Sequence, residues 1–199
     1  MKTCESEKLI DSLEADVRNI ILAATQLRSM DPEVLHEQPL PGKWSVVQVL
    51  EHLNSYGRYY LLAIEKSMQR DMPAAPVFKP GWLGDYFTRL MKPAEDGAIH
   101  HKMQALKSHR PPKGLDFFPV VNEFLEQQRY LLDLLEMARQ KNMGRVRVPI
   151  SLTKYLRLKL GDTFRFLVAH EQRHLVQIKN TLAALEESKG ISPTVHPAM

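Results

Sequence analysis

Four long stretches of the sequence repeat apolar residues at every third or fourth position, and this pattern limits the chain to few folds. The stretches span residues 6–30, 45–68, 119–141 and 162–187. Apolar residues at this spacing lie along one face of an α-helix. Helices of this length bury such faces by packing together in a bundle. We therefore predict an all-α fold, a four-helix bundle formed by a single domain over residues 1–199.

Local signals mark where the helices begin. Ser45, with Gln48 three residues later, is typical of a capping box, in which each side chain binds the backbone N–H group of the other residue. Pro119 suits the first turn of the third helix because its missing N–H group needs no partner there. Asp162 is the predicted N-cap of the last helix. The Asp31-Pro32 pair is expected to end the first helix.

The segments between the helices differ in character. Residues 71–118 contain six prolines and are predicted to form a long crossover between the second and third helices, with a short helix at residues 83–91. Long connections of this kind are usually functional, so we expect this one to cover a site. Residues 145–150 and 155–160 alternate with period two and predict at most a minor β-hairpin. Residues 188–199 are expected to be a frayed tail.

Four reactive side chains outside the helices are expected to lie in solvent. His100, His101 and His109 belong to the crossover and have polar neighbours, so exposed loop histidines are a better interpretation than metal ligands. Cys4 is expected to be a free, exposed thiol in a frayed N-terminus.

Composition limits the cellular compartment and the classes of partner that we expect for the protein. A single cysteine excludes a disulfide framework and fits reducing surroundings. The N-terminus has no apolar run typical of a signal peptide, and no stretch approaches the ~18 apolar residues that span a bilayer. We therefore expect a cytoplasmic protein without membrane contact. The net charge of +4 is too small to indicate nucleic-acid binding by itself, and none is expected.

The last helix carries His170-Glu171-Gln172-Arg173-His174, which matches the H-E-x-x-H signature of zinc proteases. Histidines four residues apart project from one face of a helix and can bind one metal ion. The longer metzincin pattern requires Gly in place of Gln177 and His in place of Asn180, and the sequence predicts almost no sheet to hold a peptide. A protease therefore fits poorly, and another kind of metal site fits better.

A third histidine supports this interpretation. His52 lies beside the apolar line of the second helix, as His170 and His174 lie beside that of the last helix. In a bundle the three imidazoles can meet at one point, and three protein ligands with one open position are typical of a catalytic metal site. Imidazole suits zinc, nickel, iron or copper, and its chemistry alone does not choose among them; zinc or nickel is the ion that we expect. Acid is expected to strip the metal, because only neutral imidazole binds it.

Three further side chains are candidate catalytic residues. Glu171 falls on the apolar line of the last helix, where a buried carboxylate needs a partner. It could orient a ligand histidine, pair with an arginine at the rim, or serve as the general base of a reaction. Gln177, one turn beyond His174, is placed to bond to a ligand histidine or to bound water. Tyr56, one turn beyond His52, is placed to supply an O–H group. Ordinary packing is the alternative for both.

Two segments resemble a known family. Residues 43–53 (KWSVVQVLEHL) resemble the second-helix motif of the DinB-like (DinB/YfiT) family, and residues 169–178 (AHEQRHLVQI) resemble its fourth-helix motif. The resemblance implies a bacterial, cytosolic four-helix bundle, often a homodimer, with His52, His170 and His174 as ligands of a divalent metal. Characterised members are thiol-dependent, namely bacillithiol S-transferases and a mycothiol-dependent maleylpyruvate isomerase. The long crossover leaves the substrate open.

Three hypotheses follow. The first is a metal-dependent enzyme that transfers a small molecule to a low-molecular-weight thiol held at the three-histidine site. The second is a metal-dependent hydrolase with Glu171 as the base. The third is a non-catalytic stress or binding module whose metal is structural or absent, which a fourth protein ligand sealing the site would favour.

Overall fold

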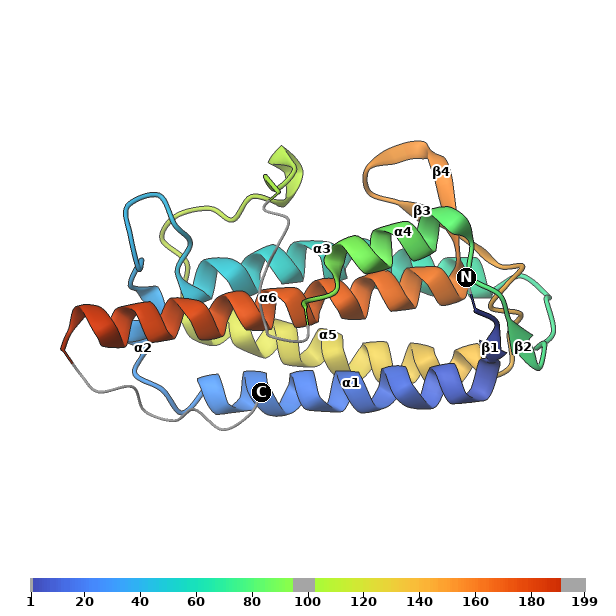
Figure 1. Ribbon diagram of the computed structural model, residues 1–199, viewed down its shortest axis with the longest axis horizontal. Helices are drawn as coiled ribbons and strands as arrows, with labels where there is room; N and C mark the ends of the chain where they lie inside the picture. Colours follow the sequence, from blue (N-terminus) through green and yellow to red (C-terminus); the bar gives the residue numbers. More distant parts are fainter. Residues whose placement is uncertain (1, 95–102, 191–199) are drawn as a thin grey trace.

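The structure is a computed structural model that describes residues 2–94 and 103–190, and it confirms the predicted four-helix bundle (Figure 1). The described part of the chain contains six α-helices, one 3-10 turn and four short strands. In chain order these are β1 (Cys4–Glu5), α1 (Ser6–Leu27), α2 (Pro32–His36), α3 (Val46–Met68), β2 (Val77–Phe78), α4 (Trp82–Met91), η1 (Lys107–His109), α5 (Phe117–Ala138), β3 (Arg147–Ile150), β4 (Thr153–Lys159) and α6 (Leu160–Ser188).

The bundle consists of α1, α3, α5 and α6, and α4 packs on the outside against α6 (Figure 1). Helices α3 and α5 are neighbours that run in the same direction. Asn54 donates to the backbone oxygen of Val120 at 2.9 Å, and four residues further along α3 Arg58 pairs with Glu123 at 2.6 Å. The segment that joins the end of α3 to the start of α5 must therefore run back along the length of the bundle, which explains the long crossover.

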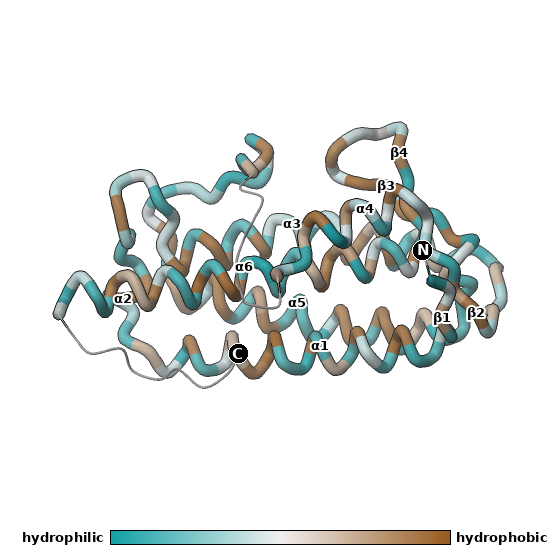
Figure 2. The backbone as a smooth tube through the Cα atoms, in the orientation of Figure 1, coloured by the Kyte–Doolittle hydropathy of each residue, from teal (hydrophilic) through white to brown (hydrophobic). Residues whose placement is uncertain are grey.

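Apolar periodicity accounts for the core. Brown apolar and teal polar residues alternate along each long helix in Figure 2, as expected where one face of the helix is buried. The largest fully buried side chains come from all four bundle helices, among them Ile20, Ile64, Phe124 and Phe164. Burial of one such side chain contributes about 1.5–3 kcal/mol.

The start of α3 is fixed as the sequence predicts. Ser45 Oγ accepts from the Gln48 amide at 3.4 Å, and Gln48 Oε1 accepts from the Ser45 amide at 3.1 Å, so the capping box is complete. Pro119 lies in the first turn of α5, which begins two residues earlier with Asp116 as its N-cap. These local bonds satisfy backbone N–H groups that the helix itself leaves unpaired.

The predicted role of Asp162 is wrong. Helix α6 follows β4 directly and begins at Leu160, so Asp162 lies inside its first turn. The buried carboxylate accepts from the Gly81 amide at 2.7 Å and pairs with Arg165 at 3.2 Å. Asp162 therefore fixes the crossover to α6 instead of capping the helix.

The chain ends and connections differ in detail from expectation. The first helix stops at Leu27, and the short helix α2 follows. Cys4 does not lie in a frayed, exposed end, because β1 pairs antiparallel with β2 of the crossover and partly buries the thiol. Strands β3 and β4 form the predicted antiparallel hairpin. Helix α6 continues to Ser188, and residues 191–199 of the expected tail lie outside the described residues.

Among residues 2–94 and 103–190, no helix combines the length and the apolar character that crossing a bilayer requires.

Candidate metal centre

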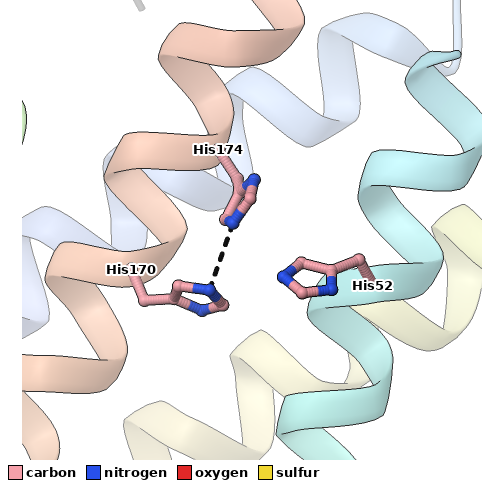
Figure 3. Close-up of side chains that lie close together, drawn as sticks. All are labelled: His52, His170 and His174. Carbon is pink, nitrogen blue, oxygen red and sulfur yellow. Dashed lines mark hydrogen bonds between the residues drawn. The ribbon is translucent and has the colours of Figure 1, made fainter. Parts of the chain in front are cut away.

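Three buried histidines from two helices meet inside the bundle (Figure 3). His52 comes from α3, and His170 and His174 come from successive turns of α6. One nitrogen of each ring lies within 4.8 Å of the other two. The Nε2 atoms of His170 and His174 are 3.1 Å apart, and the His52 ring centroid is 4.7 Å from that of His174. The structure thus brings together the three imidazoles that the sequence analysis selected.

Hydrogen bonds to the outer nitrogens orient two of the rings. His52 Nδ1 donates to the backbone oxygen of His109 at 2.7 Å, and His174 Nδ1 donates to Gln177 Oε1 at 2.8 Å. A ring that donates from Nδ1 keeps its Nε2 lone pair free when it is neutral. Both Nε2 atoms are therefore available at the centre of the cluster. The outer nitrogen of His170 is buried and has no hydrogen-bond partner among the described residues.

Burial keeps all three imidazoles neutral at pH 7. Loss of solvation lowers the pKa of His52, and it lowers the pKa of His174 to about 3. For His170, burial together with the nearby His174 and His52 rings lowers the pKa well below its usual range. Neutral imidazole is the form that binds metal, so the rings need not release a proton to do so.

This donor set fits a divalent metal ion. With metal–nitrogen bonds of about 2.0–2.1 Å, two ligands of a tetrahedral ion lie about 3.3 Å apart. The 3.1 Å separation between the Nε2 atoms of His170 and His174 is close to that value. The Nε2 lone pairs of His52 and His174 are free at the centre of the cluster, where a cation would be bound by them. His52, His170 and His174 could therefore hold such an ion.

The histidines open onto a cleft of about 600 Å³. The loop of residues 39–44 and helix α6 form its walls, and the crossover contributes Met91, Met103 and Ala105. The crossover thus lines the site, as its length led us to expect. No aspartate or glutamate in the described part of the chain lines the cleft.

Gln177 and Tyr56 lie where the sequence analysis placed them. Gln177 accepts from His174, and the Tyr56 ring lies with its centroid 4.4 Å from that of His170 and 5.1 Å from that of His52. Burial raises the pKa of Tyr56 to about 12. The phenol therefore keeps its proton at pH 7 and has an O–H group that it can donate.

Glu171 does not bond to a ligand histidine, which is one of the three alternatives that the sequence leaves open. Its Oε1 accepts from Gln128 Nε2 of α5 at 3.0 Å, and the carboxyl group does not line the cleft. The reason is helix geometry, since one residue beyond His170 is about 100° around the helix axis. Glu171 therefore faces α5, whereas His170 faces α3. Burial raises the pKa of Glu171 to about 8.

His109 was wrongly assigned to the solvent. It is buried, its backbone oxygen binds His52, and its ring centroid lies 4.0 Å from that of Tyr56. Nothing in the local sequence marks this role, because it depends on where the crossover lies against α3. His100 and His101 fall outside the described residues.

Comparisons with known proteins identify the family and the fold. Residues 16–178 match the family model of the DinB superfamily. No curated protein matched the chain. Among solved structures, the chain is similar to YfiT from Bacillus subtilis, with a TM-score of 0.53 and 18% sequence identity over 94% of this chain and 89% of that one. YfiT is described as a probable metal-dependent hydrolase with an unusual four-helix bundle topology. At this identity the likeness concerns the fold.

The raised pKa of Glu171 predicts how stability depends on pH. A carboxyl group whose pKa rises on folding stabilises the protein below the unfolded pKa, and this contribution is lost as the pH rises through the folded pKa. Between about pH 4.5 and 8, Glu171 should therefore lower the free energy of unfolding by about 1.4 kcal/mol per pH unit. Glu171→Gln should remove this slope in protein stripped of metal with EDTA.

Urea unfolding of both proteins from pH 5.5 to 9 measures the effect. The difference between the two stability curves should widen up to about pH 8 and then stay constant. Glu126→Gln, at an exposed position of α5, is the matched control and should follow the wild type. Parallel curves for Glu171→Gln and wild type would contradict the prediction.

Proposed function

The chain belongs to the DinB superfamily, and from this premise we propose that it is an enzyme which holds a divalent metal ion at His52, His170 and His174 and joins a small thiol to an electrophilic substrate. The observation that carries the proposal is the convergence of three buried, neutral imidazoles at the base of a cleft. Clefts of this volume are typical of small-molecule sites.

The histidine cluster supports a catalytic rather than a sealed site. In the described part of the chain, no fourth His, Cys, Asp or Glu joins the three histidines. Three protein ligands leave a position open to a substrate, whereas structural sites are usually closed by four. When bound, a divalent ion such as zinc or nickel supplies a Lewis acid that lowers the pKa of a thiol or water.

Thiol transfer suits the residues around the cleft better than hydrolysis. Water is a far weaker acid than a thiol, and enzymes that activate it commonly use a carboxylate as general base. The described lining has no carboxylate, and Glu171 is bonded to Gln128 on the other side of α6. In the proposed reaction the thiol sulfur bonds to an electrophilic carbon, the leaving group departs with its electron pair, and the thiol proton passes to solvent.

Hydrolysis is the second candidate, and the description of YfiT as a probable metal-dependent hydrolase favours it. The polar groups at the site serve either reaction. Tyr56 lies beside the rings of His52 and His170 and presents a protonated phenol, while Gln177 orients His174. The two candidates differ in whether a carboxylate must take a proton.

The ligand assignment predicts which substitutions remove metal. Protein purified without a His tag should contain stoichiometric zinc or nickel, and His52→Ala and His170→Ala should each lose most of it, because two imidazoles hold an ion weakly. His36→Ala is the control, since that ring is exposed and bonds to the backbone of Pro32 and Leu115 instead. Elemental analysis provides the measurement. Unchanged metal content in both site variants would rule out this site.

Glu171→Gln distinguishes thiol transfer from base-assisted hydrolysis. Loss of a general base typically lowers the rate by about 10²–10⁴-fold. We expect Glu171→Gln to retain its metal and to keep the rate of cysteine addition to chlorodinitrobenzene within a few-fold of wild type. Hydrolysis of p-nitrophenyl acetate is assayed in parallel. A metal-dependent esterase activity that collapses in Glu171→Gln, without any thiol transfer, would favour the hydrolase instead.

A further inference from the structure

Exposed apolar side chains gather at the mouth of the cleft. Leu40 from the linker before α3 is 62% exposed, and Met103 from the crossover is 49% exposed, although both line the cleft. These two residues are 63 positions apart in the sequence and meet only through the fold. Apolar side chains that converge in a concave site mark a surface that an apolar ligand covers.

The apolar surface is continuous with the histidine cluster. The Trp44 ring lies with its centroid 5.0 Å from that of His52 and also lines the cleft, and Met91 lies on the lining as well. The α6 wall is polar and includes Arg173, Gln177 and Asn180. A ligand in this cleft therefore meets the histidines at one end, apolar side chains along one wall, and two amides together with the Arg173 side chain along the other.

We infer that the electrophilic substrate carries an alkyl or aryl group, and that Leu40, Trp44, Met91 and Met103 bind this group. The inference rests on the proposed function, because the reacting end of the substrate lies at the histidines. A cleft of about 600 Å³ holds a small thiol and such a substrate together. Polar electrophiles of the same reactivity bind more weakly, because they leave this wall in contact with water.

Two ligand series test the inference on the full-length protein loaded with Co²⁺. The first runs from ethanethiol to octanethiol, and the second from acetohydroxamate to octanohydroxamate, with binding followed in the visible Co²⁺ spectrum. Burial of one methylene contributes about 0.8 kcal/mol, so affinity should rise about fourfold per methylene until the wall is covered. Leu40→Ser and Met103→Ser should flatten the rise. Leu62→Ser should not, since Leu62 on α3 is also 62% exposed but does not line the cleft.

The outcomes separate this inference from the proposed function. Equal affinity along both series would overturn the inference alone. A steep hydroxamate series without any response to thiols would support the apolar wall and overturn thiol chemistry. No response to either head group would overturn both. A change of oligomeric state in Leu40→Ser, with an unchanged series, would show that a second copy of the chain covers the wall and would overturn the inference.

An independent observation concerns His109. The crossover reaches α3 through two hydrogen bonds and one ring contact. The backbone oxygen of His109 accepts a hydrogen bond from His52 Nδ1. The Ser55 hydroxyl accepts from His109 Nδ1 at 3.0 Å and donates to the backbone oxygen of His52 at 2.7 Å. The His109 ring packs on the ring of Tyr56. His109 is buried although it lies in the short 3-10 turn η1 of the crossover.

The geometry points to His109 as a positioning residue for the histidine cluster. Its oxygen holds the proton of His52 on Nδ1 and so directs the Nε2 lone pair toward His170 and His174. Its side chain holds that oxygen in place, because the ring is fixed between Ser55 and Tyr56. The crossover thereby completes a site whose three candidate ligands all lie on other elements.

Substitution of the side chain tests this role through metal affinity, measured by competition with a chelator. Loss of such an outer partner typically costs 10–100-fold in affinity. His109→Ala should fall in that range. His109→Phe keeps the ring contact but not the bond to Ser55 and should lose less. Lys107→Ala, an exposed position in the same turn, should equal the wild type.

The melting temperature of the metal-free protein separates positioning from folding. Ser55→Ala removes one bond of the network and should weaken metal binding with little change in that temperature. Wild-type affinity in both His109→Ala and Ser55→Ala would overturn the role of His109. So would a loss of affinity in Lys107→Ala as large as in His109→Ala.

Discussion

The parallel arrangement of α3 and α5 sets the architecture of this protein. Neighbouring helices that run in the same direction cannot be joined by a short turn, so the chain must travel back along the bundle. The crossover does so, and it is anchored where it passes other elements, by the β1–β2 pair near its start, by Gly81 on Asp162 and by His109 on His52. A segment made necessary by helix direction thereby becomes part of the candidate site.

Burial then decides the chemistry of the polar groups along α6. His170 and Glu171 are adjacent in sequence and both are buried, yet they face different helices. Loss of solvation favours the neutral form of each, which lowers the pKa of the imidazole and raises that of the carboxyl group. The imidazole is thus ready to bind a cation, whereas the carboxyl group is held in a protonated pair with Gln128 below about pH 8.

The cleft brings together the features on which the proposed two-substrate reaction rests. The histidines lie at its base, amides and the Arg173 side chain lie along α6, and apolar residues from the linker and the crossover lie near its mouth. The chain belongs to the DinB superfamily and shares its fold with YfiT. The crossover supplies part of the cleft lining. The crossover residues therefore help to decide which ligand the cleft accepts.

The sequence by itself determined the helices and the faces that they bury, because both follow from interactions within a few residues. The capping box of Ser45 and Gln48, the β3–β4 hairpin and the spacing of His170 and His174 are local in this sense. The sequence also predicted that His52 would meet His170 and His174, because the core-facing sides of bundle helices converge. Only the tertiary structure decided the partners of Asp162, Glu171 and His109. Those contacts join residues 43 to 81 positions apart, and they depend on helix rotation and the path of the crossover, which local pattern does not specify.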